Sequence, residues 1–129
     1  HNIQMENKDL QQYIQDIVQL QVQVKFFHWQ TKIYSKHIAL DGLFNAIITN
    51  IDEFTEIAMG KYGRIEVAGL SYTFINVSDE NVISVVDGAI DMCIKLTDTL
   101  DAKIDTDLLN VRDELLAKLN QTKYLLTLK

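Results

Sequence analysis

Two kinds of metal-binding side chain, imidazoles and carboxylates, recur along one helix-forming stretch of this sequence. His37 and Asp41 are four residues apart, and so are Asp52 and Glu56. An α-helix turns about 100° per residue, so with His37 at zero Asp41 falls at about 40°, Asp52 at about 60° and Glu56 at about 100°. All four are therefore predicted to share one helix face. Carboxylate oxygens combined with one or two imidazole nitrogens are a ligand set that suits iron.

These two pairs cannot hold one ion within a single chain. Asp41 and Asp52 are separated by eleven residues, which is roughly 16 Å along a helix axis. Two copies of the helix packed antiparallel would bring the His37 and Asp41 end of one chain to the Asp52 and Glu56 end of the other. The spacing therefore predicts a metal site of the iron type across a dimer interface.

The same pairing predicts where the two chains are related by symmetry. Facing positions have residue numbers that sum to about 93, which places the two-fold axis near residues 45–48. A charged residue in place of Ile48 is expected to split this dimer.

Each of these residues also has an ordinary explanation. A carboxylate on a helix is usually solvated, and His28, between Phe27 and Trp29, would commonly be a hydrogen-bonded interface histidine. Their joint placement beside apolar neighbours favours a shared role, because ionised groups there need partners. The chain has no glycine-rich phosphate loop, nucleophile elbow, paired CxxC motif or Glu-x-x-His motif. The predicted third and fourth helices contain no histidine, so a metal centre would have to come from the first two helices.

The apolar periodicity predicts four helices, over about residues 8–31, 35–60, 78–100 and 105–126. Ser78 is a suitable N-cap for the third helix, Asp105 or Thr106 for the fourth, and Gly60 and Gly63 suit the end of the second. A strand over residues 20–26 is the weaker alternative, because no turn residue bounds it. The fold class expected is all-α: a ferritin-like antiparallel four-helix bundle with one long crossover connection between the second and third helices. The positions expected to face the core are Leu10, Ile14, Ile17, Val24, Phe27, Leu40, Phe44, Ile47, Ile51, Phe54, Ala58, Val82, Val86, Ala89, Cys93, Leu96, Leu100, Leu108, Val111, Leu115, Leu119 and Leu126.

A second apolar stripe on the first helix does not belong to this core. Val18, Val22, Trp29 and Ile33 lie on another face, which is expected to contact a neighbouring subunit. The connector run over residues 72–75 is also expected to cover an interface.

Composition sets the remaining limits. The 129 residues form one domain, their net charge is -6, and no apolar segment is long enough to cross a membrane. The acidic balance and the lack of a basic tail make DNA binding unexpected. The single Cys93 is expected to be a buried apolar residue in a reducing, cytoplasmic setting. Met5 is expected to be the natural start, with residues 1–4 left from a cloning vector.

The sequence resembles the Dps-type miniferritins of the ferritin-like superfamily. The run from Phe27 to Gln30 (Phe-His-Trp-Gln) is similar to that family's His-Trp-Asn signature, and residues 37–44 followed by Asp52 and Glu56 are similar to its ferroxidase motif. The resemblance implies that His28, His37 and Asp41 come from one subunit and that Asp52 and Glu56 come from its two-fold mate. It also implies oxidation of ferrous iron, usually by hydrogen peroxide, and storage of the product in a hollow dodecamer. The interval from His28 to His37 is nine residues, shorter than is usual in that family, which predicts a tight turn between the first two helices.

Two hypotheses follow. The first is a miniferritin-like ferroxidase, in which Asp52, Glu56 and His28 bind one iron while His37 and Asp41 bind a second, weaker one. The second is a non-enzymatic ferritin-like protein that serves in dimerisation or sequesters a divalent metal.

Overall fold

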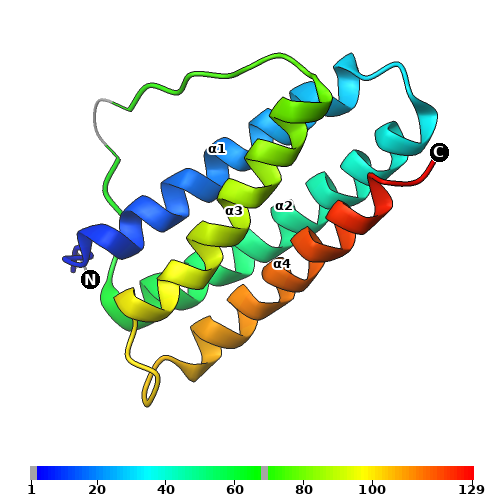
Figure 1. The fold of residues 1–129 in the computed structure, drawn as a ribbon. Coiled ribbons are helices and arrows are strands. Elements are labelled where there is room, and N and C mark those ends of the chain that lie inside the picture. Colours follow the sequence, from blue (N-terminus) through cyan, green and yellow to red (C-terminus); the bar gives the residue numbers. More distant parts are fainter. Residues whose placement is uncertain (1–2, 68–69) are drawn as a thin grey trace.

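The computed structural model describes residues 3–67 and 70–129, and its regular structure is helical. Residues 1 and 2, part of the segment attributed to a vector, lie outside the described residues. Figure 1 shows four helices packed against each other, which confirms the all-α, four-helix prediction. The helices are α1 (Lys8–Gln30), α2 (Tyr34–Tyr62), α3 (Asp79–Thr99) and α4 (Thr106–Leu125).

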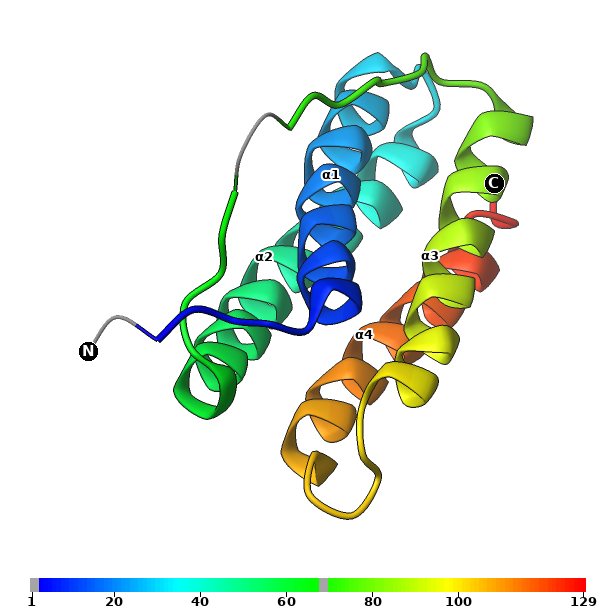
Figure 2. The same ribbon diagram turned by 90° about the vertical axis from the view of Figure 1, so that its left-hand side faces the viewer.

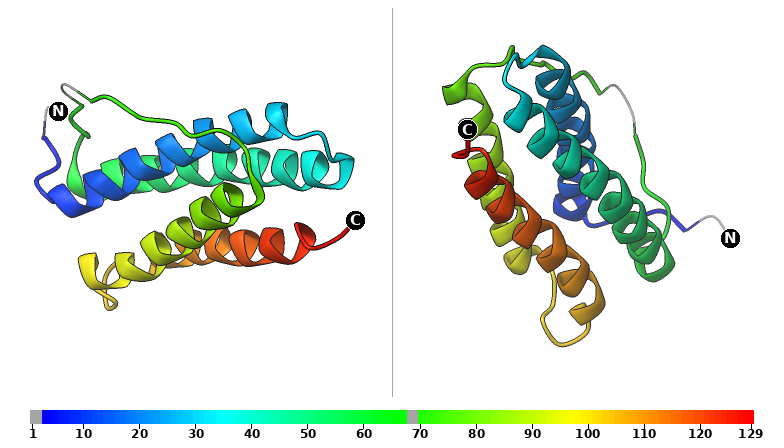
Figure 3. Two further views of the ribbon diagram at one scale, coloured as in Figure 1. Left: turned by 45° about the horizontal axis from the view of Figure 1, so that its top comes forward. Right: turned by 90° about the vertical axis from the view of Figure 1, so that its right-hand side faces the viewer.

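The four helices form two layers, one of α1 and α2 and the other of α3 and α4 (Figure 3). Neighbouring helices run antiparallel, and the diagonal pair α2 and α3 runs in one direction (Figure 1). Contacts at the helix ends agree with this arrangement. The Lys36 ammonium pairs with Asp79, so the starts of α2 and α3 are close, and Asn7 at the start of α1 donates to the carbonyl of Thr99 at the end of α3.

Apolar side chains from all four helices meet between the two layers. Twenty of the predicted core positions are buried, including Cys93, and the other two, Phe44 and Leu100, are partly buried against the core. The second stripe on α1 remains on the surface, since Val18 and Val22 are more than one third exposed and Trp29 is 64% exposed. The helical repeat of α1 therefore places one apolar stripe in the core and leaves the second stripe exposed on the surface.

Local sequence sets the helix ends. The Asn7 and Ser78 side chains accept hydrogen bonds from the amides of Leu10 and Asn81 at the starts of α1 and α3. Gly63 ends α2 with φ of 92°, a conformation that side-chain-bearing residues rarely adopt, so α2 continues past Gly60 to Tyr62.

The prediction that Asp105 or Thr106 caps α4 is only partly right. Asp105 occupies the N-cap position, but its side chain makes no capping bond and turns to other partners. The weaker strand alternative for residues 20–26 is wrong, because this segment is helical throughout.

The connector between α2 and α3 runs along the length of α1 and crosses over it towards α3 (Figure 2). Ile65 lies in a groove between α1 and α2, and Thr73 and Ile75 line a pocket between α1 and α3. A row of glutamines on α1, here called the glutamine clamp, binds the backbone of the connector. Gln23 is bidentate: its side chain donates to the carbonyl of Ile75 (2.9 Å) and accepts from the same residue's amide (2.8 Å). Gln11 accepts from the amide of Glu66, Gln19 donates to the carbonyl of Thr73, and Gln30 accepts from the amide of Val77.

The predicted covering run of the connector lies against its own chain. Phe74 packs on Phe26 of α1 with ring centroids 5.3 Å apart, and the Tyr72 hydroxyl donates to the carbonyl of Gln15. Among the described residues, no helix has the length and apolar character that crossing a bilayer requires.

Candidate functional site

A three-residue turn brings two of the predicted ligands into contact. Residues 31–33 separate α1 from α2, so His28 in the last turn of α1 lies beside His37 in the first turns of α2. The imidazole rings stack with centroids 3.8 Å apart and planes inclined by 21°. The tight turn expected from the short interval is present.

The two histidines are locked to each other by a reciprocal pair of hydrogen bonds. His28 Nδ1 lies 2.9 Å from the carbonyl oxygen of His37, and His37 Nδ1 lies 2.9 Å from the carbonyl oxygen of His28. A carbonyl only accepts, so each Nδ1 must donate. In the neutral rings each Nε2 then carries the lone pair, and an Nδ1–H bonded to a carbonyl is the usual support of a metal-binding histidine.

Asp41 lies next to this histidine pair but is held loosely. One of its carboxylate oxygens is 3.8 Å from His28 Nε2 and 3.9 Å from the ammonium of Lys25, and the side chain is 43% exposed. Both distances exceed hydrogen-bond length. Lys25 is itself positioned over the Phe44 ring, 4.4 Å from its centroid. The carboxylate of Asp41 therefore keeps free acceptor capacity near His28 Nε2, with one competing cation, Lys25, close by.

The other two predicted ligands are separate from this group. Asp52 and Glu56 are exposed, one turn apart, towards the C-terminal part of α2. Within residues 3–67 and 70–129, no group of three or more His, Cys, Asp or Glu side chains is arranged to hold a metal ion. The structure thus brings His28, His37 and Asp41 together and leaves Asp52 and Glu56 apart from them.

The surface between the two groups is apolar and hollowed. A groove between α1, α2 and the connector is lined by Val18, Ile48, Thr55 and Ile65, and it includes Asp52. Ile48, next to the predicted two-fold axis, is 38% exposed. The face that carries the carboxylates is therefore also a face with uncovered apolar surface.

A second carboxylate cluster, which the sequence did not predict, lies at the opposite end of α2. Asp105 is 2% exposed; it accepts hydrogen bonds from the Tyr62 hydroxyl and the Asp101 amide (2.9 Å), and the Lys61 ammonium is 3.4 Å away. Burial acts to raise the pKa of Asp105, but the bonds from Tyr62, Asp101 and Lys61 outweigh it and hold that pKa below the ordinary value. The hydrogen bond to Asp105 and burial together raise the pKa of Tyr62. The helix-start position of Asp105 was visible in the sequence, but its partner Tyr62 is 43 residues away.

Residues 28–126 match the sequence model of a family of unknown function, DUF5856. The chain belongs to the DUF5856 family. No curated protein and no solved structure matches it significantly.

The DUF5856 match covers both carboxylate clusters and both histidines. It begins at His28 and ends at Leu126, so α2, α3 and α4 lie inside it up to the end of the last helix. Most of α1 lies outside the matched span, and with it three glutamines of the clamp, Gln11, Gln19 and Gln23.

Proposed function

We propose that this DUF5856 protein binds ferrous iron between two copies of the chain and oxidises it, in the manner of a Dps-type miniferritin. The observation that carries the proposal is the histidine pair. His28 and His37 direct their Nδ1 hydrogens to backbone carbonyls, which leaves both Nε2 atoms as ligands beside the loosely held Asp41.

The second half of the site would come from the other copy. In an antiparallel pair of α2 helices, Asp52 of one chain is level with Asp41 of its mate, and Glu56 is level with His37. The ligand set would be two imidazoles and three carboxylates, which tolerates both ferrous and ferric iron. The apolar groove around Ile48 supports this pairing, since a face with uncovered apolar surface favours a partner.

The ferritin-like description of the fold is part of the same proposal. It is supported by the antiparallel packing of neighbouring helices and by the connector that spans the length of α1. The dimer is the smallest assembly that the site requires, and a closed dodecameric cage would be built from such dimers.

The reaction uses iron as substrate. Two ferrous ions each give up one electron, and one hydrogen peroxide takes both electrons with two protons to form two water molecules. The chain's part is to hold the two ions close together, because simultaneous delivery of both electrons avoids the one-electron product, hydroxyl radical.

Ferrous oxidation by peroxide, followed by absorbance of the ferric product, tests the proposal. The variant carrying both Asp52→Ala and Glu56→Ala is expected to lose the protein-dependent rate, whereas Glu53→Ala, which removes another exposed carboxylate of α2, is expected to keep it. Equal rates for wild type and the double variant would overturn the ferroxidase. Metal binding without oxidation would instead establish the sequestering protein.

Mixing two inactive variants tests whether the site is shared. Chains with His37→Ala and Asp41→Ala keep the carboxylate half, and chains with Asp52→Ala and Glu56→Ala keep the histidine half. Random mixing makes half of the dimers mixed, each with one intact site of two, so about a quarter of the wild-type rate should return. Ile48→Glu in both chains is expected to abolish that recovery by splitting the dimer. No recovery in the mixture would show that the halves do not meet.

A further inference from the structure

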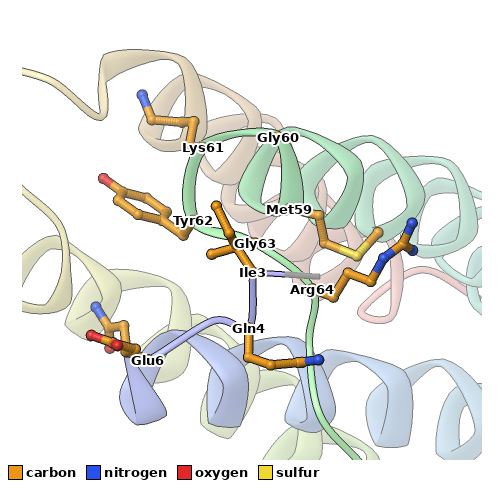
Figure 4. A pocket seen from close by; sticks show the side chains of 10 residues that line it. Ile3, Gln4, Glu6, Met59, Gly60, Lys61, Tyr62, Gly63 and Arg64 are labelled. Carbon is orange, nitrogen blue, oxygen red and sulfur yellow. The ribbon is translucent and has the colours of Figure 1, made fainter. Parts of the chain in front are cut away.

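A pocket lies at the end of α2 that is remote from the histidine pair. It is formed where residues 3–7 pass beside the last turn of α2, and the Ile3 carbonyl accepts a hydrogen bond from the Arg64 amide (2.8 Å). Figure 4 shows Ile3 and Gln4 running past the end of the helix, with the Met59 side chain on the same side as Arg64. The lining is mixed: Ile3 and Met59 are apolar, and the remainder is polar or backbone.

At Gly60 the pocket is lined by helix backbone without a side chain. A Cβ atom built at Gly60 would meet no atom within 4 Å, so the helix backbone is accessible there. A flat ring could lie against this bare backbone and reach the Met59 thioether, a favourable partner for an aromatic ring. The pocket therefore suits a side chain with an apolar body and a polar tip, as tyrosine has.

The chain presents such a side chain at the other end of the same helix face. Tyr34, the first residue of α2, is 77% exposed, more than any other exposed large hydrophobic residue in the described part of the chain. On the helical wheel used for the ligands Tyr34 falls at about 60° and Met59 at about 40°, within the stripe of Asp41 and Asp52. Their numbers sum to 93, so the pairing that joins the ligands also sets Tyr34 of one copy level with Met59 of the other.

We infer that Tyr34 of a second copy occupies the pocket beside Met59 and Gly60. This inference rests on the antiparallel pairing of the proposed function and extends it outward by one layer beyond the metal ligands. The two Tyr34 contacts lie at the two ends of the interface and seal the two sites from solvent at their outer edge. The segment before α1 is then part of the interface, because Glu6 and Asn7 also line the pocket.

Crosslinking between single-cysteine positions tests this contact. Tyr34→Cys chains are mixed with Met59→Cys chains, without metal, and disulfide-linked dimers are measured on a non-reducing gel. The mixture is expected to crosslink, whereas either variant alone is not, since equivalent positions would be about 37 Å apart along the paired helices. Tyr124→Cys, at a position 64% exposed on α4, mixed with Met59→Cys controls for random collision. The native Cys93 is buried and should not react.

Sedimentation of metal-free protein provides the second measurement. Tyr34→Glu is expected to raise the dimer dissociation constant at least tenfold, and Tyr124→Glu is expected to leave it unchanged; circular dichroism confirms that each variant is folded. If the two inactive variants recover activity when mixed but Tyr34→Cys and Met59→Cys do not crosslink, this inference is overturned and the shared site stands. A chain that is monomeric at every concentration overturns both.

Discussion

Two carboxylates, Asp41 near the start of α2 and Asp105 of the α4 N-cap beside the end of α2, have very different surroundings. Asp105 is buried and receives hydrogen bonds from Tyr62 and from the Asp101 backbone, with Lys61 alongside. The Asp41 side chain is 43% exposed, and its nearest partners, His28 Nε2 at 3.8 Å and the Lys25 ammonium at 3.9 Å, are beyond hydrogen-bond length. The carboxylate of Asp105 therefore has its hydrogen-bond partners supplied by the chain, whereas that of Asp41 keeps unused acceptor capacity.

From this difference we expect the Asp105 cluster to support the fold and the Asp41 group to be available for the proposed binding. A buried carboxylate with all its partners supplied from the chain stabilises the folded state, and no ligand is needed to complete it. Under the proposed function, the loosely held Asp41 carboxylate beside His28 would gain its full set of partners when a metal ion binds. Changes at the Asp105 cluster should therefore alter stability, and changes at Asp41 should alter binding.

The largest expected effect is that of Asp105→Ala on stability. The change leaves the Tyr62 hydroxyl and the Asp101 amide without their acceptor in a buried place, which is expected to cost about 3 kcal/mol of unfolding free energy. For a chain of this size the melting temperature should fall by about 10 °C, measured by thermal denaturation followed by circular dichroism. Ferrous binding by the folded variant should be unchanged. A loss of binding without a loss of stability would reverse the assignment of the two clusters.

The ionisation of Asp105 should also make the stability of the protein depend on pH. The pKa of Asp105 is lowered in the folded state, so its stabilisation is fully present above the ordinary carboxyl pKa of about 4 and is lost as pH falls through the lower folded value. Asp105→Asn is expected to be about 2 kcal/mol less stable than wild type at pH 7, and the difference should shrink below about pH 4. Urea denaturation at pH 7, 5, 4 and 3 measures it. A constant difference over this range would contradict the linkage.

The change Asp41→Asn is expected to affect ferrous binding and to leave stability almost unchanged. Because the side chain is partly exposed and lacks a short hydrogen bond to either His28 or Lys25, the unfolding free energy should change by less than about 0.5 kcal/mol. Loss of a charged ligand should weaken ferrous binding at least tenfold, or about 1.4 kcal/mol, as measured by calorimetry under anaerobic conditions. Asp113→Asn, a change at another exposed carboxylate, is the control for a general charge effect.

The smallest expected effect is at Lys25. Its ammonium lies 3.9 Å from Asp41 and, under the proposed function, would compete with an incoming metal ion for that carboxylate. A partly exposed pair of this kind is worth about 0.2 to 1 kcal/mol, so Lys25→Met should tighten ferrous binding by up to about fivefold. The same calorimetric titration checks this. Weaker binding in the variant would show that Lys25 supports the site instead of competing for it.

Most of the fold followed from local sequence. Helix number, the core positions and the Ser78 cap depend on short-range periodicity and on hydrogen bonds within one turn, and each was predicted correctly. The end of α2 was placed two residues too early because Gly60 and Gly63 look alike in the sequence, and only Gly63 takes a positive φ.

The candidate site was less accessible to sequence reasoning. Helix spacing grouped His37 with Asp41, but the contact between His28 and His37 depends on how a three-residue turn folds, and only the family resemblance placed them together. The sequence did not reveal Asp105 as the centre of a hydrogen-bond network, because its partner Tyr62 is distant in sequence. The metal itself stays a prediction.

The glutamine clamp has a consequence for how this family can vary. Gln11, Gln19 and Gln23 bind main-chain amides and carbonyls of the connector, groups that are the same whatever side chain each residue carries. Connector positions other than Tyr72 and Phe74, whose side chains contact α1, should therefore vary freely, while the glutamine positions on α1 should resist change. In an alignment of relatives that extends over α1, the glutamines would be retained and the segment they bind would differ.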